Sequence, residues 1–193
     1  MNQSNYMSGM NIGLVAMAAK PLHAGHFELI KRAARENDEV DVYVSTGDRR
    51  RSGEFVITGD KMIEVWGILT QIIPENVNLH YVNNPIRAMW EQLEAENLRL
   101  ASGDYDVANY PIYSDPIDIA ANFPTSRLER YVQHLLQQNL LTLQPIARSS
   151  TVNISGTQMR EWLKMGEKGL FMKHLPAELT PEQSEEIYNI LAA

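Results

Sequence analysis

The chain has 193 residues, enough for one compact domain with a sizeable core, and its 44% hydrophobic and 21% charged content is ordinary for a globular protein. It contains no cysteine, which excludes disulfide bonds and thiolate metal sites. Its net charge of −7 argues against nonspecific nucleic-acid binding, and no apolar run approaches the roughly 20 residues that span a membrane.

The first predicted elements are a strand, a helix and a second strand. Residues 11–19 form an apolar run typical of a buried strand, and residues 40–44 alternate in hydropathy before a turn. Between them, residues 23–36 carry Phe27 and Ile30 at helical spacing. This order predicts a parallel pair of strands joined by a crossover helix.

The same alternation continues along the chain. Thr58 is a favourable N-cap for a helix that ends near residue 73, and residues 77–82 have the composition of a third strand. Pro85 then opens another helix at the first-turn position that proline favours, and this helix ends near Gly103.

The second half of the chain is predicted to add two strands and a helix. Residues 105–113 and 140–146 are the fourth and fifth predicted strands, with a helix over residues 126–138 between them. The fourth predicted strand has a less regular pattern than the others, because it contains Pro111, which interrupts a strand.

Residues 114–124 fit neither a strand nor a helix pattern, and we interpret them as a loop near an active site. Two carboxylates in this segment, Asp115 and Asp118, either contact a ribose hydroxyl or a metal ion or are simply solvated.

The chain is expected to form a single domain over residues 1–193, without repeats or linkers. Residues 1–10 are polar and lack the order of a signal peptide, so we expect a short leader on a cytoplasmic protein with no membrane partner. Helices are predicted at residues 158–165 and 181–191, and residues 166–193 are expected to form a C-terminal helical extension.

A histidine motif follows the first predicted strand. Residues 21–26 read Pro-Leu-His-Ala-Gly-His, which puts His23 and His26 on one face of a first helical turn. A helix N-terminus at the end of a parallel strand favours phosphate, and imidazoles donate hydrogen bonds to phosphate oxygens. Gly25 would let phosphate or ribose approach the backbone, and Lys20 adds a cation or is a solvated loop lysine. The alternative is that one histidine only caps or packs the helix.

A second motif lies at residues 154–160, which read Ile-Ser-Gly-Thr-Gln-Met-Arg and also place a loop before a predicted helix. Although the chain as a whole is acidic, positive side chains are clustered locally. Arg160 is one of them and borders this loop. Three further arginines follow the second predicted strand and either grip the phosphate of an acceptor or are surface charge: Arg49, Arg50 and Arg51.

These two motifs together carry a family resemblance. Residues 21–26 resemble the signature of the HxGH nucleotidyltransferase superfamily, which includes nicotinamide mononucleotide adenylyltransferases, phosphopantetheine adenylyltransferases and cytidylyltransferases. Residues 154–160 are similar to its second signature, I-S-x-T-x-x-R. The form with Gly156 is similar to archaeal-type nicotinamide mononucleotide adenylyltransferases and ATP sulfurylases.

The resemblance implies an α/β fold, a Rossmann-like open parallel sheet with helices on both faces. The implied reaction transfers a nucleoside monophosphate, AMP from ATP first of all, to a small phosphorylated acceptor such as nicotinamide mononucleotide, and releases pyrophosphate. His23 and His26 would stabilise the transition state, Arg160 would neutralise pyrophosphate, and Mg²⁺ would bridge the phosphates, with its protein ligands unknown. The residues that would hold the β- and γ-phosphates are Ser155, Gly156 and Thr157.

Two other functions stay open. A cytidylyltransferase would use CTP and an alcohol phosphate, because motif spacing does not encode base choice. A nucleotide-binding sensor without turnover is suggested by Met17 and Ala19, which stand where related enzymes carry the glycine and aromatic residue of a G-x-F-x-P sequence. The presence of both histidines, Thr157 and Arg160 argues against a sensor. A homo-oligomer is compatible with each reading.

Overall fold

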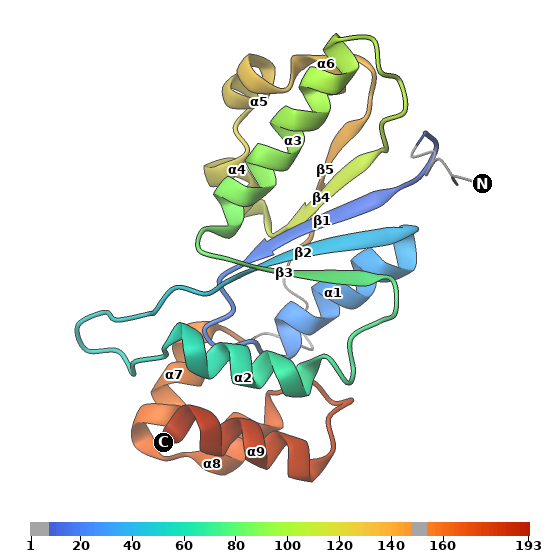
Figure 1. Cartoon of the computed structure of the whole chain (residues 1–193). Helices are drawn as coiled ribbons and strands as arrows, with labels where there is room; N and C mark the ends of the chain where they lie inside the picture. Colours follow the sequence, from blue (N-terminus) through green and yellow to red (C-terminus); the bar gives the residue numbers. More distant parts are fainter. Residues whose placement is uncertain (1–7, 148–153) are drawn as a thin grey trace.

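The computed structural model describes residues 8–147 and 154–193, and in these residues five strands form a fully parallel sheet (Figure 1). The order across the sheet is β3-β2-β1-β4-β5. The strand order therefore reverses at β1, and ligands of open α/β sheets bind in the crevice at such a switch point. The strands are β1 (Ile12–Met17), β2 (Glu39–Ser45), β3 (Val77–Val82), β4 (Tyr110–Ser114) and β5 (Leu141–Pro145).

Helices cover both faces of the sheet (Figure 1), which confirms the predicted fold class. One face packs against α1 (Ala24–Glu36), and the other packs against α3 (Pro85–Ala101) and α6 (Gln133–Gln137). The remaining helices are α2 (Gly59–Leu69), α4 (Pro116–Asn122), α5 (Thr125–Tyr131), α7 (Gly156–Met165), α8 (Lys168–Lys173) and α9 (Pro181–Ala192). None of the helices in the described part of the chain has the length and hydropathy needed to cross a membrane.

The sheet separates two hydrophobic cores. Leu14 and Val15 are neighbours in β1 and are both fully buried, but they point to opposite faces. Val15 belongs to the core formed with α1, α2 and α7–α9, and Leu14 to the core formed with α3, α5 and α6. Because the central strand is packed on both faces, its carboxyl end holds the residues that follow it in a fixed position.

Several predicted elements have different bounds in the structure. The fourth strand begins only at Tyr110, and the predicted helix over residues 126–138 is two short helices because the backbone leaves helical geometry at Val132. Residues 114–124 contain helix α4 where we expected a loop, since Asp115 caps it by accepting from the backbone N–H of Asp118 at 2.8 Å. The C-terminal extension forms α8 and α9. Within the predicted leader, residues 1–7 lie outside the described residues.

Gly59 allows α2 to begin directly against the end of β2, and Gly59→Ala should destabilise the protein. A Cβ atom at this position would lie 1.8 Å from the backbone oxygen of Thr46. Backbone has to move to relieve that overlap, so we expect a loss of about 1–3 kcal/mol. The same change at Gly67, inside the same helix with open space around it, should stabilise by up to about 1 kcal/mol. Thermal unfolding compares the two variants, and equal melting temperatures would contradict the expectation that the overlap at position 59 destabilises the protein.

Candidate active site

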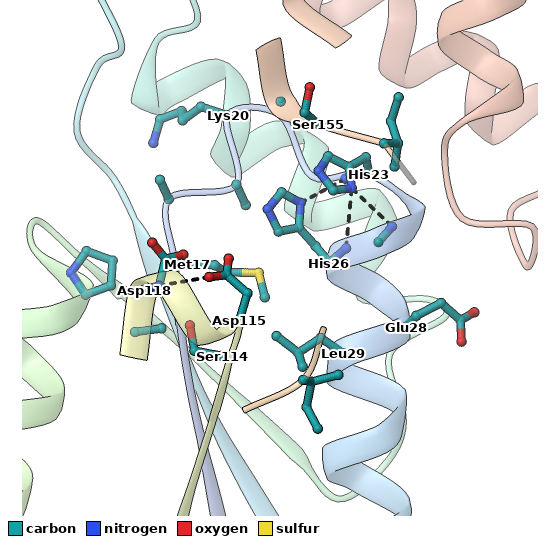
Figure 2. A pocket seen from close by; sticks show the side chains of 18 of the residues that line it. Met17, Lys20, His23, His26, Glu28, Leu29, Ser114, Asp115, Asp118 and Ser155 are labelled. Atoms are coloured by element: carbon teal, nitrogen blue, oxygen red, sulfur yellow. Dashed lines mark hydrogen bonds between the residues drawn. The ribbon is translucent and has the colours of Figure 1, made fainter. Parts of the chain in front are cut away.

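A cavity of about 740 Å³ lies at the carboxyl ends of β1 and β4 (Figure 2). The N-terminal turns of α1 and α7 border it, together with the first turn of α4. Its volume is within the range of roughly 300–1,000 Å³ that is typical of small-molecule sites. The predicted residues that line it are Lys20, His23, Gly25, His26, Arg49, Ser155, Gly156, Thr157 and Arg160.

Both histidines of the first motif cap helix α1. His23 is the N-cap residue, and its Nδ1 accepts hydrogen bonds from the backbone N–H groups of Gly25 at 3.1 Å and His26 at 3.4 Å. His26 returns the interaction, because its Nδ1 accepts from the backbone N–H of His23 at 3.2 Å. The rings stack with their centroids 3.8 Å apart. Since Nδ1 is the acceptor in each ring, the neutral imidazoles carry their proton on Nε2 and present it as a donor.

Gly25 makes room for the His23 ring. A Cβ atom on Gly25 would lie 2.9 Å from Cε1 and 3.0 Å from Nδ1 of His23. The sequence suggests a glycine that admits a ligand to the backbone, and the structure adds a second reason, the close approach of the capping imidazole. A side chain at this position would push away the ring that both caps α1 and lines the cavity.

Helix α7 begins with a reciprocal cap as well. The Oγ of Ser155 accepts from the backbone N–H of Gln158 at 3.2 Å, and the Gln158 side chain accepts from the N–H of Ser155 at 3.1 Å. Gly156 leaves space for an arginine, because its Cβ would be 2.8 Å from Nη1 of Arg160. Thr157 accepts from Nη2 of Arg160 at 3.2 Å. The N-terminus of α7 thus faces the cavity with a partial positive charge.

Arg160 ties this helix to the first motif. Its side chain is buried, with the residue only 6% exposed, and Nη1 donates to the backbone oxygen of Lys20 at 2.8 Å. Its Nε lies 3.4 Å from Oε2 of Glu54, an ion pair without hydrogen-bond geometry, and Nε has no hydrogen-bond acceptor among the described residues. Burial, and next the nearby charge of Arg49, lower the pKa of Arg160, but a guanidinium stays protonated in proteins.

Lys20 is a second buried cation at the cavity. It is 5% exposed, and its Nζ donates to the backbone oxygen of Ser45 at 2.7 Å. Burial lowers the pKa of Lys20, while the charge of Asp48 opposes this shift. The lysine is therefore anchored to the end of β2 and is not the solvated loop residue that the sequence also allowed.

The three consecutive arginines have different positions. Arg49 lines the cavity and makes two hydrogen bonds to Glu54, from Nε at 2.7 Å and from Nη2 at 3.0 Å. Arg50 and Arg51 are exposed and are not among the cavity-lining residues, and Arg50 pairs with Asp48 at 3.1 Å. Glu54 was not singled out from the sequence, where the only signal is an acidic residue in a basic loop.

Acidic side chains line the opposite side of the cavity. Figure 2 shows Asp115 and Asp118 across the open space from the rings of His23 and His26. The segment of residues 114–124, which contains α4, therefore borders the cavity. The described residues include no group of three side chains that could hold a metal ion by themselves.

No protein-family model and no curated protein matches the sequence. Solved structures match in fold. A bifunctional NMN adenylyltransferase/ADP ribose pyrophosphatase from Francisella tularensis, complexed with AMP and a manganese ion, matches 95% of the chain at 11% identity with a TM-score of 0.56. The chain spans about half (52%) of that protein.

Two shorter structures match over nearly their full length. Nicotinic acid mononucleotide adenylyltransferase from Plasmodium falciparum, complexed with NaAD, matches 94% of the chain and 97% of its own at 14% identity, TM-score 0.59. A candidate nicotinate-nucleotide adenylyltransferase from Vibrio parahaemolyticus matches 92% of the chain and 98% of its own at 16% identity, TM-score 0.54. At such identities the likeness establishes the fold: the chain has the Rossmann-like fold of these adenylyltransferases.

Proposed function

We propose that the protein is a nucleotidyltransferase that transfers AMP from ATP to a small phosphorylated acceptor, with nicotinamide mononucleotide as the first candidate, and releases pyrophosphate. The observation that carries this proposal is the meeting of two helix N-termini, those of α1 and α7, in one cavity at the switch point of the sheet. Each of these helix N-termini carries one of the two sequence motifs. Arg160 of the second motif donates a hydrogen bond to the backbone oxygen of Lys20, just before the first motif. The fold shared with adenylyltransferases supports the same reaction class.

The triphosphate would lie along the cationic side of the cavity. The N–H groups at the start of α7, with Ser155 and Thr157, would hold the β- and γ-phosphates. Arg160 and Lys20 would neutralise the pyrophosphate as it leaves. Arg49 would add a phosphate contact, while Arg50 and Arg51 would contribute only to the local potential.

The chemistry is a displacement at the α-phosphorus. An oxygen of the acceptor phosphate forms a new bond to the α-phosphorus, and the bond from this phosphorus to the oxygen bridging to the β-phosphate breaks. The electron pair leaves with pyrophosphate, so negative charge builds on oxygens around the α-phosphorus. The Nε2–H groups of His23 and His26 would donate to these oxygens without transferring a proton, held in place by their capping bonds.

Mg²⁺ fits this site as an ion that accompanies the triphosphate. Mg²⁺ is commonly held by one or two carboxylates together with substrate phosphates and water, and the cavity offers Asp115 and Asp118. The lack of a group of three metal-binding side chains in the described residues agrees with shared ligation rather than a protein cage. When bound, the ion would neutralise phosphate charge.

Pyrophosphate release tests the proposal. The purified protein, with Mg²⁺, is offered ATP, CTP, GTP and UTP against nicotinamide mononucleotide, phosphopantetheine and glycerol 3-phosphate. We expect release with ATP and one acceptor. Release with CTP and glycerol 3-phosphate would instead establish the cytidylyltransferase, and nucleotide binding without release from any pair would favour the sensor.

A further inference from the structure

We infer that Glu54 is a positioning residue that holds Arg49 and Arg160 side by side at the phosphate end of the cavity. This inference rests on the proposed function, because it concerns how the same cavity binds phosphate. Glu54 is not among the cavity-lining residues, whereas both arginines are. It would therefore act through the arginines and not by touching the substrate.

The contacts of Glu54 run to both arginines. Its two carboxylate oxygens accept from Nε and Nη2 of Arg49, and Oε2 is also 3.4 Å from Nε of Arg160. A bidentate pair fixes the plane of the guanidinium as well as its position. The Glu54 side chain is 28% exposed, so this geometry is only partly screened by water.

Charge balance makes the carboxylate necessary. Two guanidinium groups at one cavity wall repel each other: burial and then the charge of Arg49 lower the pKa of Arg160, while the charge of Glu54 raises it. The hydrogen bond from Arg49 lowers the pKa of Glu54 in turn, which favours its carboxylate form further. The other nitrogens of Arg160 already bond the Lys20 carbonyl and Thr157, so Glu54 is the anion that compensates its buried charge within the described residues.

The segment that carries Glu54 is braced against α7. Lys164, one turn beyond Arg160, donates from Nζ to the backbone oxygen of Gly53 at 3.0 Å. The two ends of the loop are tied to each other, because Asp48 accepts from the N–H of Gly59 at 2.8 Å. These ties set the carboxylate behind the arginines. Because Arg49 lines the cavity while it is paired, a phosphate can reach it without displacing Glu54.

A double-mutant cycle on the binding of tripolyphosphate, measured by calorimetry without Mg²⁺ or acceptor, tests this role. We expect Glu54→Ala and Arg49→Ala each to weaken binding by about tenfold or more, as for the loss of one charge-assisted contact. The double variant should bind no more than about twofold worse than Arg49→Ala, because the hydrogen bonds of Glu54 run to Arg49, while its contact with Arg160 lacks hydrogen-bond geometry. Glu54→Asp should recover part of the loss.

The controls separate position from charge. Glu185→Ala removes the same negative charge outside the cavity, where Glu185 pairs with Lys168, and should not weaken binding. Thermal unfolding checks each variant, and Glu54→Gln, which keeps the shape without the charge, serves if the alanine variant does not fold. Tighter binding by Glu54→Ala would make Glu54 a competitor of phosphate and overturn the inference, as would wild-type affinity or full additivity with Arg49→Ala.

The outcomes also distinguish this inference from the proposed function. Coupled loss of tripolyphosphate binding in a protein that releases no pyrophosphate would keep the role of Glu54 and reject the reaction. If the enzyme releases pyrophosphate but Glu54→Ala binds tripolyphosphate as the wild type does, the reaction is kept and the role of Glu54 is rejected. A wild-type protein that does not bind tripolyphosphate would overturn the inference about Glu54, and pyrophosphate release would then decide the proposed function by itself.

Discussion

Replacing His26 with glutamine should lower turnover by at least two orders of magnitude and leave the melting temperature close to that of the wild type. A donor aimed at charge that develops in the transition state is typically worth about 3–4 kcal/mol, which is a factor of about 10²–10³ in rate. Glutamine is a favoured residue at the third position of a capping box. It can therefore replace the bond that Nδ1 of His26 accepts from the backbone N–H of His23.

His26→Ala is the matched comparison, because it removes the imidazole and the cap together. It should lose as much activity as the glutamine variant and, in addition, about 1 kcal/mol of stability, the usual value of a cap. Pyrophosphate release gives the turnover numbers and thermal unfolding the stabilities. A glutamine variant that keeps turnover within tenfold of the wild type would show that His26 only caps α1.

Arg160→Ala should weaken the binding of ATP by about two orders of magnitude. The guanidinium is buried at the cavity, and charged contacts that are shielded from water contribute more to binding than exposed ones. Some stability should be lost as well, about 1–3 kcal/mol, because the Lys20 carbonyl loses its donor and Glu54 loses a cationic neighbour. Arg160→Lys should fall between, since lysine keeps the charge but not the planar fork.

Calorimetry with ATP, in the absence of an acceptor, measures this effect without turnover. Lys168→Ala is the charge-matched control, because Lys168 pairs with Glu185 and does not line the cavity. The control should bind ATP within about twofold of the wild type. An Arg160→Ala protein with wild-type affinity would remove Arg160 from the nucleotide site.

The fold and the two motifs were predictable because their signals are local. The strands are apolar or alternating runs, and the crossover helices repeat apolar residues at helical spacing, so the parallel sheet follows from the order of the segments. Ser155 is a cap residue that is recognisable in sequence, and the start of the helix at His23 follows from the apolar spacing after it. The meeting of these two starts then follows from the topology of the sheet.

The sequence could not show which loop charges reach the cavity. Arg49, Arg50 and Arg51 are chemically equivalent in the sequence, and in the structure the one that reaches the cavity wall is Arg49, which pairs with Glu54 and forms a backbone bridge with Ile57. The same carboxylate also lies 3.4 Å from Nε of Arg160 in α7, more than 100 residues away along the chain, which no local pattern reveals. Helix α4 was missed because it is a short helix of seven residues, too short for a periodic pattern.

The cap of α1 differs in its residue types from the caps of other helices in the described part of the chain. Other helices of the chain begin with the residues that cap best, including Thr58, Asn84, Ser155 and Thr180. At α1 the same positions hold imidazoles, which are not preferred caps. A chain optimised for thermal stability alone would have serine and glutamate at positions 23 and 26, and it would then lack both imidazole donors. Under the proposed function, the two histidines give α1 a less favourable cap and provide two ring donors in return.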